Sequence, residues 1–184
     1  GLISQRRDRL ILHNDAVDAI LTRRSIRSYQ AKQISEDALE TILTAGQYAP
    51  SGMNQQSAKA IVVQSKERMQ QLVQLAKAAE QVDHNPFYDA PTVILVFADA
   101  TQLAPLEDGC NVLENMMLAA HAIGLGSCWI YAAKVLFSTE EGAAFQKELG
   151  LSETDQIVGS IAVGYPDGAA PQPKPRKESF FRIV

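Results

Sequence analysis

Apolar residues recur at helical spacing in five stretches of the chain. Ser35 and Ser65 each precede such a stretch and are suited to cap the N-terminus of a helix. Pro105 favours the start of another helix through its fixed φ, and Gly124 favours its end. The pattern therefore predicts helices over residues 15–24, from Ser35 past Gly46, from Ser65 past Ala76, over residues 105–124, and over residues 138–149 behind a capping box at Ser138 and Glu141.

Shorter apolar and β-branched runs without helical spacing predict four strands. The run from Thr92 to Ala98 is apolar almost throughout, which indicates a strand buried on both faces. A predicted helix stands between each successive pair of strands, so we expect a sheet with helices on both faces, a helix–sheet–helix sandwich. The predicted strands cover residues 60–63, 92–98, 127–131 and 157–163.

The length of 184 residues predicts one domain, residues 1–184, with an N-terminal arm (1–13) and a C-terminal arm (165–184). The C-terminal arm is rich in proline and ends in the apolar sequence Phe180–Val184. We expect this apolar tip to pack against another protein surface. The stripe Leu113, Met116, Met117 and Ala120 suits either the core or a subunit face.

Composition narrows the class of protein. Hydrophobic residues make up 46% and charged residues 21%, which excludes a disordered chain. The two cysteines suit a reducing compartment, and Cys128 is expected to be a small buried hydrophobe. No apolar run reaches ~18 residues, and the N-terminus lacks the order of a signal peptide. We therefore expect a cytoplasmic protein that does not interact with a membrane.

The net charge of −4 hides an uneven distribution. Residues 1–32 carry +4, residues 33–164 carry −10 and residues 165–184 carry +2. Nucleic-acid binding is not predicted, because it requires a basic face on the folded body. Arg6, Arg7 and Arg9 suit a solvated basic tail, whereas the two basic ends together could converge on one small anion such as a phosphate.

Several kinds of catalytic site have no support in the sequence. The histidines and cysteines lack metal-ligand spacing, and neither a GxSxG elbow nor a P-loop occurs. Gly124 to Trp129 resembles the start of a dinucleotide fingerprint, but it follows a helix and precedes a strand, the reverse of the order that phosphate binding needs. An enzyme with this sequence would depend on a bound cofactor for its chemistry.

Three polar segments carry the functional signal. Arg23–Arg27 places three guanidinium groups and a hydroxyl within five residues, and Lys174–Arg176 adds two cations on a proline-stiffened arm. The loop Pro50–Asn54 supplies amide and hydroxyl groups that suit a flat polar heterocycle. Together and in this order, with Gly124–Ile130 and Gly164–Asp167, these segments resemble the FMN-dependent nitroreductase family over about residues 14–178.

The resemblance implies an α+β fold with three layers, a central and mainly antiparallel sheet, and a C-terminal arm exchanged in a homodimer. It implies FMN at the subunit interface, NAD(P)H as co-substrate and a small-molecule acceptor such as a nitroaromatic or quinone, reduced by ping-pong hydride transfer. No catalytic side chain is implied, because N5 of the flavin carries the hydride. The cofactor-binding residues that it implies are Arg23, Arg24, Ser25, Arg27, Ser51, Met53, Asn54, Ile130, Tyr131, Lys174 and Arg176.

Within this set, the resemblance assigns different parts of the flavin to different segments. Residues 23–25 face the phosphate with Lys174 and Arg176, and Arg27 lies nearer the N1/O2 edge. Residues 51–54 reach the flavin from the partner chain, and residues 129–131 offer backbone groups near N5. Two segments, Ser57-Ala58 and Tyr131-Ala132, depart from the usual family pattern, so the acceptor stays open. A specialised flavin enzyme (a dehalogenase, an enoate reductase or a flavin-fragmenting enzyme) and a non-enzymatic flavin-binding module remain alternatives.

Overall fold

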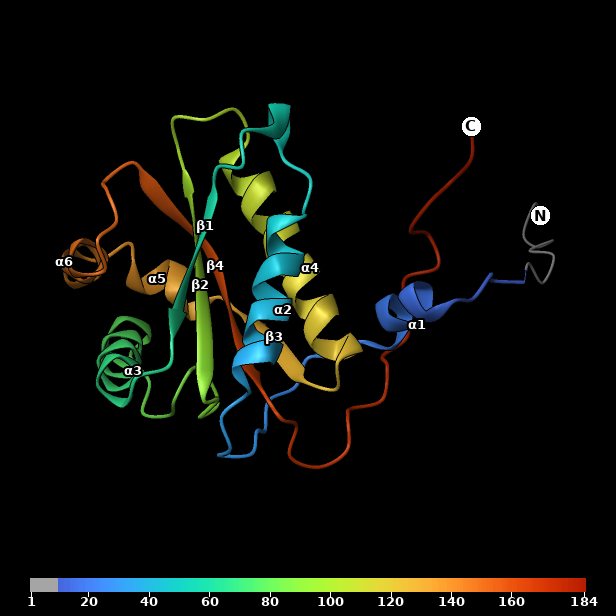
Figure 1. The fold of residues 1–184 in the computed structure, drawn as a ribbon, viewed down its shortest axis with the longest axis horizontal. Helices are drawn as coiled ribbons and strands as arrows, with labels where there is room; N and C mark the ends of the chain where they lie inside the picture. Colours follow the sequence, from blue (N-terminus) through green and yellow to red (C-terminus); the bar gives the residue numbers. More distant parts are fainter. Residues whose placement is uncertain (1–9) are drawn as a thin grey trace.

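The computed structural model describes residues 10–184, so the basic residues Arg6, Arg7 and Arg9 lie outside the described part (Figure 1). Helices and strands alternate along most of the chain, as the hydrophobic pattern predicts. The elements are α1 (Asp15–Thr22), α2 (Glu36–Gln47), the 3₁₀ turn η1 (Gly52–Asn54), β1 (Ala58–Val63), α3 (Lys66–Glu80), β2 (Thr92–Asp99), α4 (Pro105–Ala122), β3 (Gly126–Ile130), α5 (Ala132–Leu136), α6 (Glu140–Glu148) and β4 (Asp155–Gly164).

The four strands form one sheet in the order β1-β2-β4-β3, and every neighbouring pair is antiparallel. Helices α2 and α4 cover one face, and α3, α5 and α6 lie on the other (Figure 1). The predicted three-layer α+β arrangement with an antiparallel sheet is therefore confirmed.

Strand β2 explains why the longest apolar run in the sheet has no alternation. Its odd-numbered residues Val93, Leu95 and Phe97 belong to the core under α3 and α5, while Ile94, Val96 and Ala98 belong to the core under α2 and α4. Successive side chains of a strand point to opposite faces of the sheet. A central strand that lies between two helical layers must therefore be apolar on both of its faces.

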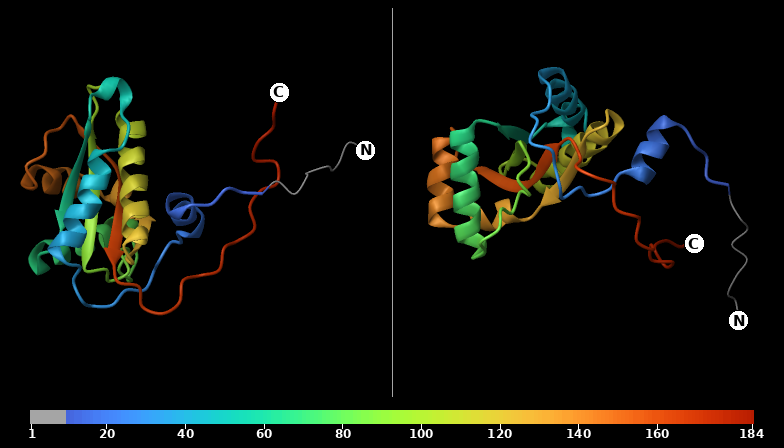
Figure 2. Two further views of the ribbon diagram at one scale, coloured as in Figure 1. Left: turned by 45° about the vertical axis from the view of Figure 1, so that its right-hand side comes forward. Right: turned by 90° about the horizontal axis from the view of Figure 1, so that it is seen from below.

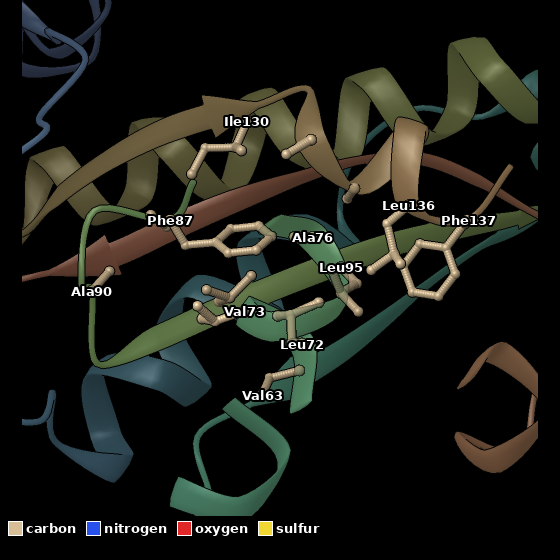
Figure 3. Packing of buried hydrophobic residues seen from close by; sticks show 14 of the residues in the cluster. Val63, Leu72, Val73, Ala76, Phe87, Ala90, Leu95, Ile130, Leu136 and Phe137 are labelled. Carbon is tan, nitrogen blue, oxygen red and sulfur yellow. The ribbon is translucent and has the colours of Figure 1, made fainter. Parts of the chain in front are cut away.

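The core under α3 and α5 is held largely by aromatic and branched side chains (Figure 3). Phe137 packs edge-on against Phe97, with ring centroids 5.0 Å apart, and stacks on Phe145 at 5.9 Å. In the other core, the stripe Leu113, Met116, Met117 and Ala120 is buried within the chain. The structure thus assigns that stripe to the core and not to a subunit face.

Most predicted helix caps are confirmed, because a capping hydroxyl or amide acts within one turn of sequence. Asn14, Ser35 and Ser65 each accept a hydrogen bond from the backbone N–H three residues on. The predicted cap at Ser138 is wrong: Thr139 accepts the bond from Gly142 N–H, at 3.0 Å. Helix α5, only five residues long, is absent from the sequence prediction.

Helix α1 and the C-terminal arm extend away from the body on the same side (Figures 1 and 2). Helix α1 has no buried residue, and it ends at Thr22, two residues before the predicted end. At the tip of the arm, Phe180 is 88% exposed and Phe181 is 66% exposed. Within residues 10–184, no helix combines the length and the apolar composition that a membrane crossing requires.

Candidate functional site

The basic segment that follows α1 lies along strand β3. Ser25 forms a parallel bridge with Ser127, and the Ile26 N–H donates to the Ser127 carbonyl at 2.9 Å. Arg23, Arg24 and Ser25 are half-buried, and Arg27 is exposed. Backbone pairing with the sheet therefore fixes this segment, while its polar side chains stay available for contacts outside the core.

Arg24 has a local role as well. Its Nη1 donates to the carbonyls of Leu21 and Arg23, at 3.0 Å and 2.7 Å. These carbonyls belong to the end of α1, where helical C=O groups lack partners and a cation is favourable. Arg24 thus also stabilises the turn that leads out of the helix.

The root of the C-terminal arm is pinned beside the same segment. Tyr29 bridges Pro166, the Gln30 N–H donates to the Tyr165 carbonyl, and the Asp167 N–H donates to the Ser28 carbonyl, both at 2.9 Å. The structure therefore joins the residues that follow the basic segment to the root of the C-terminal arm. Lys174 and Arg176 follow farther along the exposed arm and do not line the pocket described next.

A pocket of about 280 Å³ lies between the basic segment, the C-terminal end of α4 and the arm root. Its charged and polar side chains are two arginines, a histidine and two hydroxyl groups, with no carboxylate. Ser127 Oγ is buried there and has no hydrogen-bond partner among residues 10–184, while Thr22 Oγ1 lies 2.8 Å from His121 Nε2. The donor set suits an anion. The lining residues are Thr22, Arg23, Arg24, Ile26, His121, Gly124, Leu125, Ser127, Pro166, Gly168 and Ala170.

Two titratable side chains lie near the basic segment on the other side of β3. Burial raises the pKa of the Cys128 thiol, and the nearby Arg27 guanidinium partly opposes this rise. Burial also raises the pKa of the Tyr29 phenol, whose hydroxyl donates to the Ile26 carbonyl. At neutral pH both groups are uncharged, and the predicted burial of Cys128 is confirmed, since it is 2% exposed.

The polar loop that contains η1 occupies the opposite end of α4. Met53, Asn54 and Gln56 all have left-handed backbone conformations, with φ of 54°, 54° and 49°. Such conformations are costly for residues other than glycine and persist where the surroundings fix them. Met53 stands at the exposed apex, 81% accessible to solvent.

A single buried carboxylate holds this loop. Asp108, in the first turn of α4, accepts a hydrogen bond from Gly52 N–H at Oδ1 (2.8 Å) and from the Ser57 hydroxyl at Oδ2 (2.6 Å). The sequence indicated Asp108 only as an acidic residue that favours a helix N-terminus. Its partners lie 56 and 51 positions earlier, and no local pattern signals that contact.

The remaining predicted residues lie at the end of β3. Ile130 is buried, and Tyr131 is 60% exposed beside Trp129, with ring centroids 6.0 Å apart. Lys134 Nζ lies 5.9 Å from the centroid of the Tyr131 ring. At about 3.3 Å per residue, strand β3 separates Ser127 from Tyr131 by about 13 Å.

Two groups of the predicted site residues, 23–27 and 51–54, thus lie near opposite ends of α4. Thr22, next to the basic segment, contacts His121 at the C-terminal end, and Gly52 contacts Asp108 at the N-terminal end. Asp108 and His121 are 13 positions apart on α4, which is about 20 Å along the helix axis at 1.5 Å per residue. Within one chain, residues 23–27 and residues 51–54 therefore lie at separate places along α4.

Comparison with known proteins identifies the family of this chain. The sequence model of the nitroreductase family matches residues 20–165. The chain belongs to the nitroreductase family. The match runs from the helix before the basic segment to the root of the C-terminal arm, and so includes both groups of predicted site residues except those on the arm.

Individual relatives agree with this assignment. A nitroreductase with bound FMN from Bacteroides fragilis shares 32% sequence identity and a TM-score of 0.85, and the match covers 94% of this chain and 100% of the other. The NADPH-flavin oxidoreductase of Vibrio harveyi is 29% identical in an alignment of 175 positions that covers 89% of this chain and 70% of the relative. The FMN reductase (NAD(P)H) of Bacillus subtilis is 29% identical in an alignment of 184 positions that covers 90% of this chain and 72% of the relative. The predicted nitroreductase fold is confirmed.

Proposed function

We propose that this nitroreductase-family protein is an FMN-dependent NAD(P)H oxidoreductase. The observation that carries the proposal is the anion pocket beside Arg23, in a chain whose structural relative from Bacteroides fragilis contains FMN. The named relatives from Vibrio harveyi and Bacillus subtilis are flavin reductases that use nicotinamide coenzymes.

The proposed active form is a homodimer with shared sites. Within one chain, residues 23–27 and 51–54 are held about 20 Å apart along α4, which supports a site to which a second copy supplies one of the two groups. The exposed aromatic tip of the C-terminal arm and the exposed apolar side of α1 support an exchange of arms, because large exposed apolar patches mark protein interfaces.

The residues present fit the parts of the cofactor. Arg23, Arg24 and Ser25 would hold the phosphate, joined by Lys174 and Arg176 from the arm, while Arg27 would face the pyrimidine edge of the ring. Ile130 and Tyr131 would border the ring at the far end of β3, and Ser51, Met53 and Asn54 would contact it from the partner subunit. When bound, FMN supplies the capacity to accept a hydride from NAD(P)H and to pass electrons to a nitroaromatic or quinone acceptor.

The chain itself contributes position and charge. The paired backbone of Ser25 and Ser127 fixes the basic segment, so the backbone that carries the arginines is in place before the cofactor binds. Cys128 and Tyr29 stay neutral nearby, which leaves the positive charge of Arg27 uncompensated by a thiolate or phenolate. The proposed location is the cytoplasm, since the reaction draws on reduced nicotinamide.

The first experiment measures the visible spectrum of the purified protein, followed by anaerobic titration with NADH and NADPH. An oxidised flavin spectrum that bleaches with one of these coenzymes, and recovers on addition of a quinone, is expected. Flavin that binds without being reduced by either coenzyme would favour the binding-module alternative. Heat release and chromatography should give FMN; recovery of stoichiometric FAD would contradict the assignment.

A second experiment tests the shared site. Arg23→Ala and Asn54→Ala each damage one of the two groups, so each homodimer should bind FMN weakly. Unfolding and refolding an equal mixture produces heterodimers in which one site carries both changes and the other carries none. Regain of tight FMN binding at about one site per heterodimer is expected. No regain in verified heterodimers would place both groups at the same chain's site.

A further inference from the structure

We propose that Asp108 is a positioning residue for the flavin of the partner subunit, acting through the strained loop 51–56. This inference rests on the proposed function, because the loop is expected to contact that flavin. It concerns a buried residue in the first turn of α4 whose side chain bonds to Gly52 and Ser57, one before the apex and one after it.

The burial of Asp108 is the first observation. Its side chain is 2% exposed, although an aspartate is costly to remove from water unless its oxygens are well bonded. One carboxylate oxygen accepts from the backbone before the apex, at Gly52, and the other accepts from the hydroxyl after it, at Ser57. Asp108 therefore closes the loop at both ends with one rigid group.

The conformation of the loop is the second observation. Three of the four residues from Met53 to Gln56 are left-handed, and none of them is glycine. Loop strain of this kind requires external anchors. Besides Asp108, the Leu103 N–H donates to Gln55 Oε1 at 2.9 Å, and Asn111 Nδ2 donates to the Pro50 carbonyl at 3.3 Å.

All these anchors come from residues 103–111, the entry to α4 and its first two turns, so the loop is fixed to one rigid element. The strained apex with Met53 and Asn54 is exposed. A strained and firmly anchored loop with an exposed apex is the arrangement expected of a preformed binding element, since ordering it in advance lowers the entropy cost of binding. The cofactor of the neighbouring subunit is the ligand that the proposed dimer places against it.

The test compares Asp108→Ala with Glu107→Gln, its exposed neighbour in the same turn, in the full-length protein. Light scattering and circular dichroism first establish that each variant is a folded dimer. The FMN dissociation constant is then measured by flavin fluorescence. Loss of two buried bonds to a carboxylate should weaken FMN binding about tenfold or more in Asp108→Ala. Glu107→Gln should bind like the wild type.

Asp108→Asn provides the conservative comparison. Its amide oxygen still accepts from Gly52 N–H, and its NH₂ group meets the Ser57 oxygen, so binding should stay within about threefold of the wild type. Should Asp108→Ala fail to fold, Ser57→Ala removes one of the two bonds and should give an intermediate loss. Equal FMN affinity in the folded Asp108→Ala, or in Ser57→Ala, and the wild type overturns the proposal.

A double-mutant cycle separates positioning from general destabilisation. If Asp108 acts through the loop, Asn54→Ala should have much less effect in the Asp108→Ala background than in the wild type, because the apex is already displaced. Additive losses would contradict the proposal. Hydrogen exchange at Gly52 should also accelerate in Asp108→Ala, with or without flavin. A wild-type protein that binds no FMN overturns the proposed function and the positioning role together, whereas tight wild-type binding with no loss in the variants overturns only the latter.

Discussion

The two ends of helix α4 are built in different ways. At its N-terminal end, side chains bond to the backbone of a strained loop, with Asp108 as the central group. At its C-terminal end, the basic segment is fixed by backbone pairing with β3, through Ser25 and Ser127. The arginines of this segment line the anion pocket or are exposed to solvent.

The difference follows from what each end offers a ligand. A loop that presents a few neutral groups must have its conformation specified in detail, since amide and thioether contacts depend on position. A cluster of guanidinium groups needs only a fixed backbone, because charge attraction tolerates several side-chain geometries and Arg forks adapt to phosphate oxygens. The proposed dimer combines one end of each kind at each flavin.

Removing residues 179–184 should have the largest effect on this arrangement. These residues include the exposed aromatic pair Phe180 and Phe181, and the residues of this segment are exposed, so the folded body does not depend on them. The truncated protein should keep its secondary structure, dissociate at micromolar concentration and lose most of its flavin. Light scattering with flavin absorbance measures both changes together.

The control for the truncation is Lys177→Ala, which alters the arm just before the deleted residues and keeps the aromatic tip. It should stay dimeric and yellow. A truncated protein that is a fully flavinated monomer would mean that one chain completes the site. The two ends of α4 would then not contribute to flavin sites shared between two subunits.

Arg23→Ala should have the next largest effect, and at the basic end alone. A lost charge-assisted contact to phosphate is worth about 1.5–3 kcal/mol, or about ten- to a hundredfold in the FMN dissociation constant. Oxidised and reduced flavin should be affected equally, because the phosphate does not change charge. Arg68→Ala is the matched control, since Arg68 lies on α3 and pairs with Glu148 at 3.1 Å. Equal affinities in both variants would remove Arg23 from the phosphate site.

Arg27→Ala should change the redox potential more than the affinity. A guanidinium at the N1/O2 edge meets more negative charge in the reduced flavin, so its removal disfavours reduction. The midpoint potential should fall by some tens of millivolts, at ~30 mV for each ~1.4 kcal/mol of a two-electron couple. Anaerobic redox titration of Arg27→Ala and Arg23→Ala tests whether the potential changes in the first variant only. An unchanged potential with FMN still bound would leave Arg27 as a binding or structural residue.

The smallest expected effect is a difference in thiol reactivity between the two cysteines, one of which lies near each end of α4. Cys110 is exposed, whereas Cys128 is buried with a raised pKa, so its thiol stays protonated at pH 7–8.5 and reacts slowly. In Cys110→Ser, a thiol reagent should label the remaining cysteine only after unfolding; in Cys128→Ser, the folded protein should react. Rapid labelling of Cys128 in the folded protein would show that the segment over β3 opens to solvent.

Most helix starts and the buried central strand could be predicted from the sequence, because they depend on interactions between residues close together in the chain. The caps at Asn14, Ser35 and Ser65 act within one helical turn, and the apolar run of β2 reports burial on two faces directly. The cap at Ser138 was misplaced because the adjacent Thr139 offers an equivalent hydroxyl and only backbone geometry selects between them. Helix α5 is too short to show a period.

The sequence by itself determined the order of elements, the apolar central strand and the basic and polar segments of the nitroreductase family, because each depends on residues close together in the chain. Only the tertiary structure decided that α4 separates the two groups of predicted site residues, that its methionine stripe belongs to the core, and that Asp108 closes the loop from Gly52 to Ser57. These features depend on contacts between residues in different elements, which for Asp108 and its two partners are 56 and 51 positions apart. An aspartate in the first turn of a helix has the same local signature whether it faces water or anchors a distant loop.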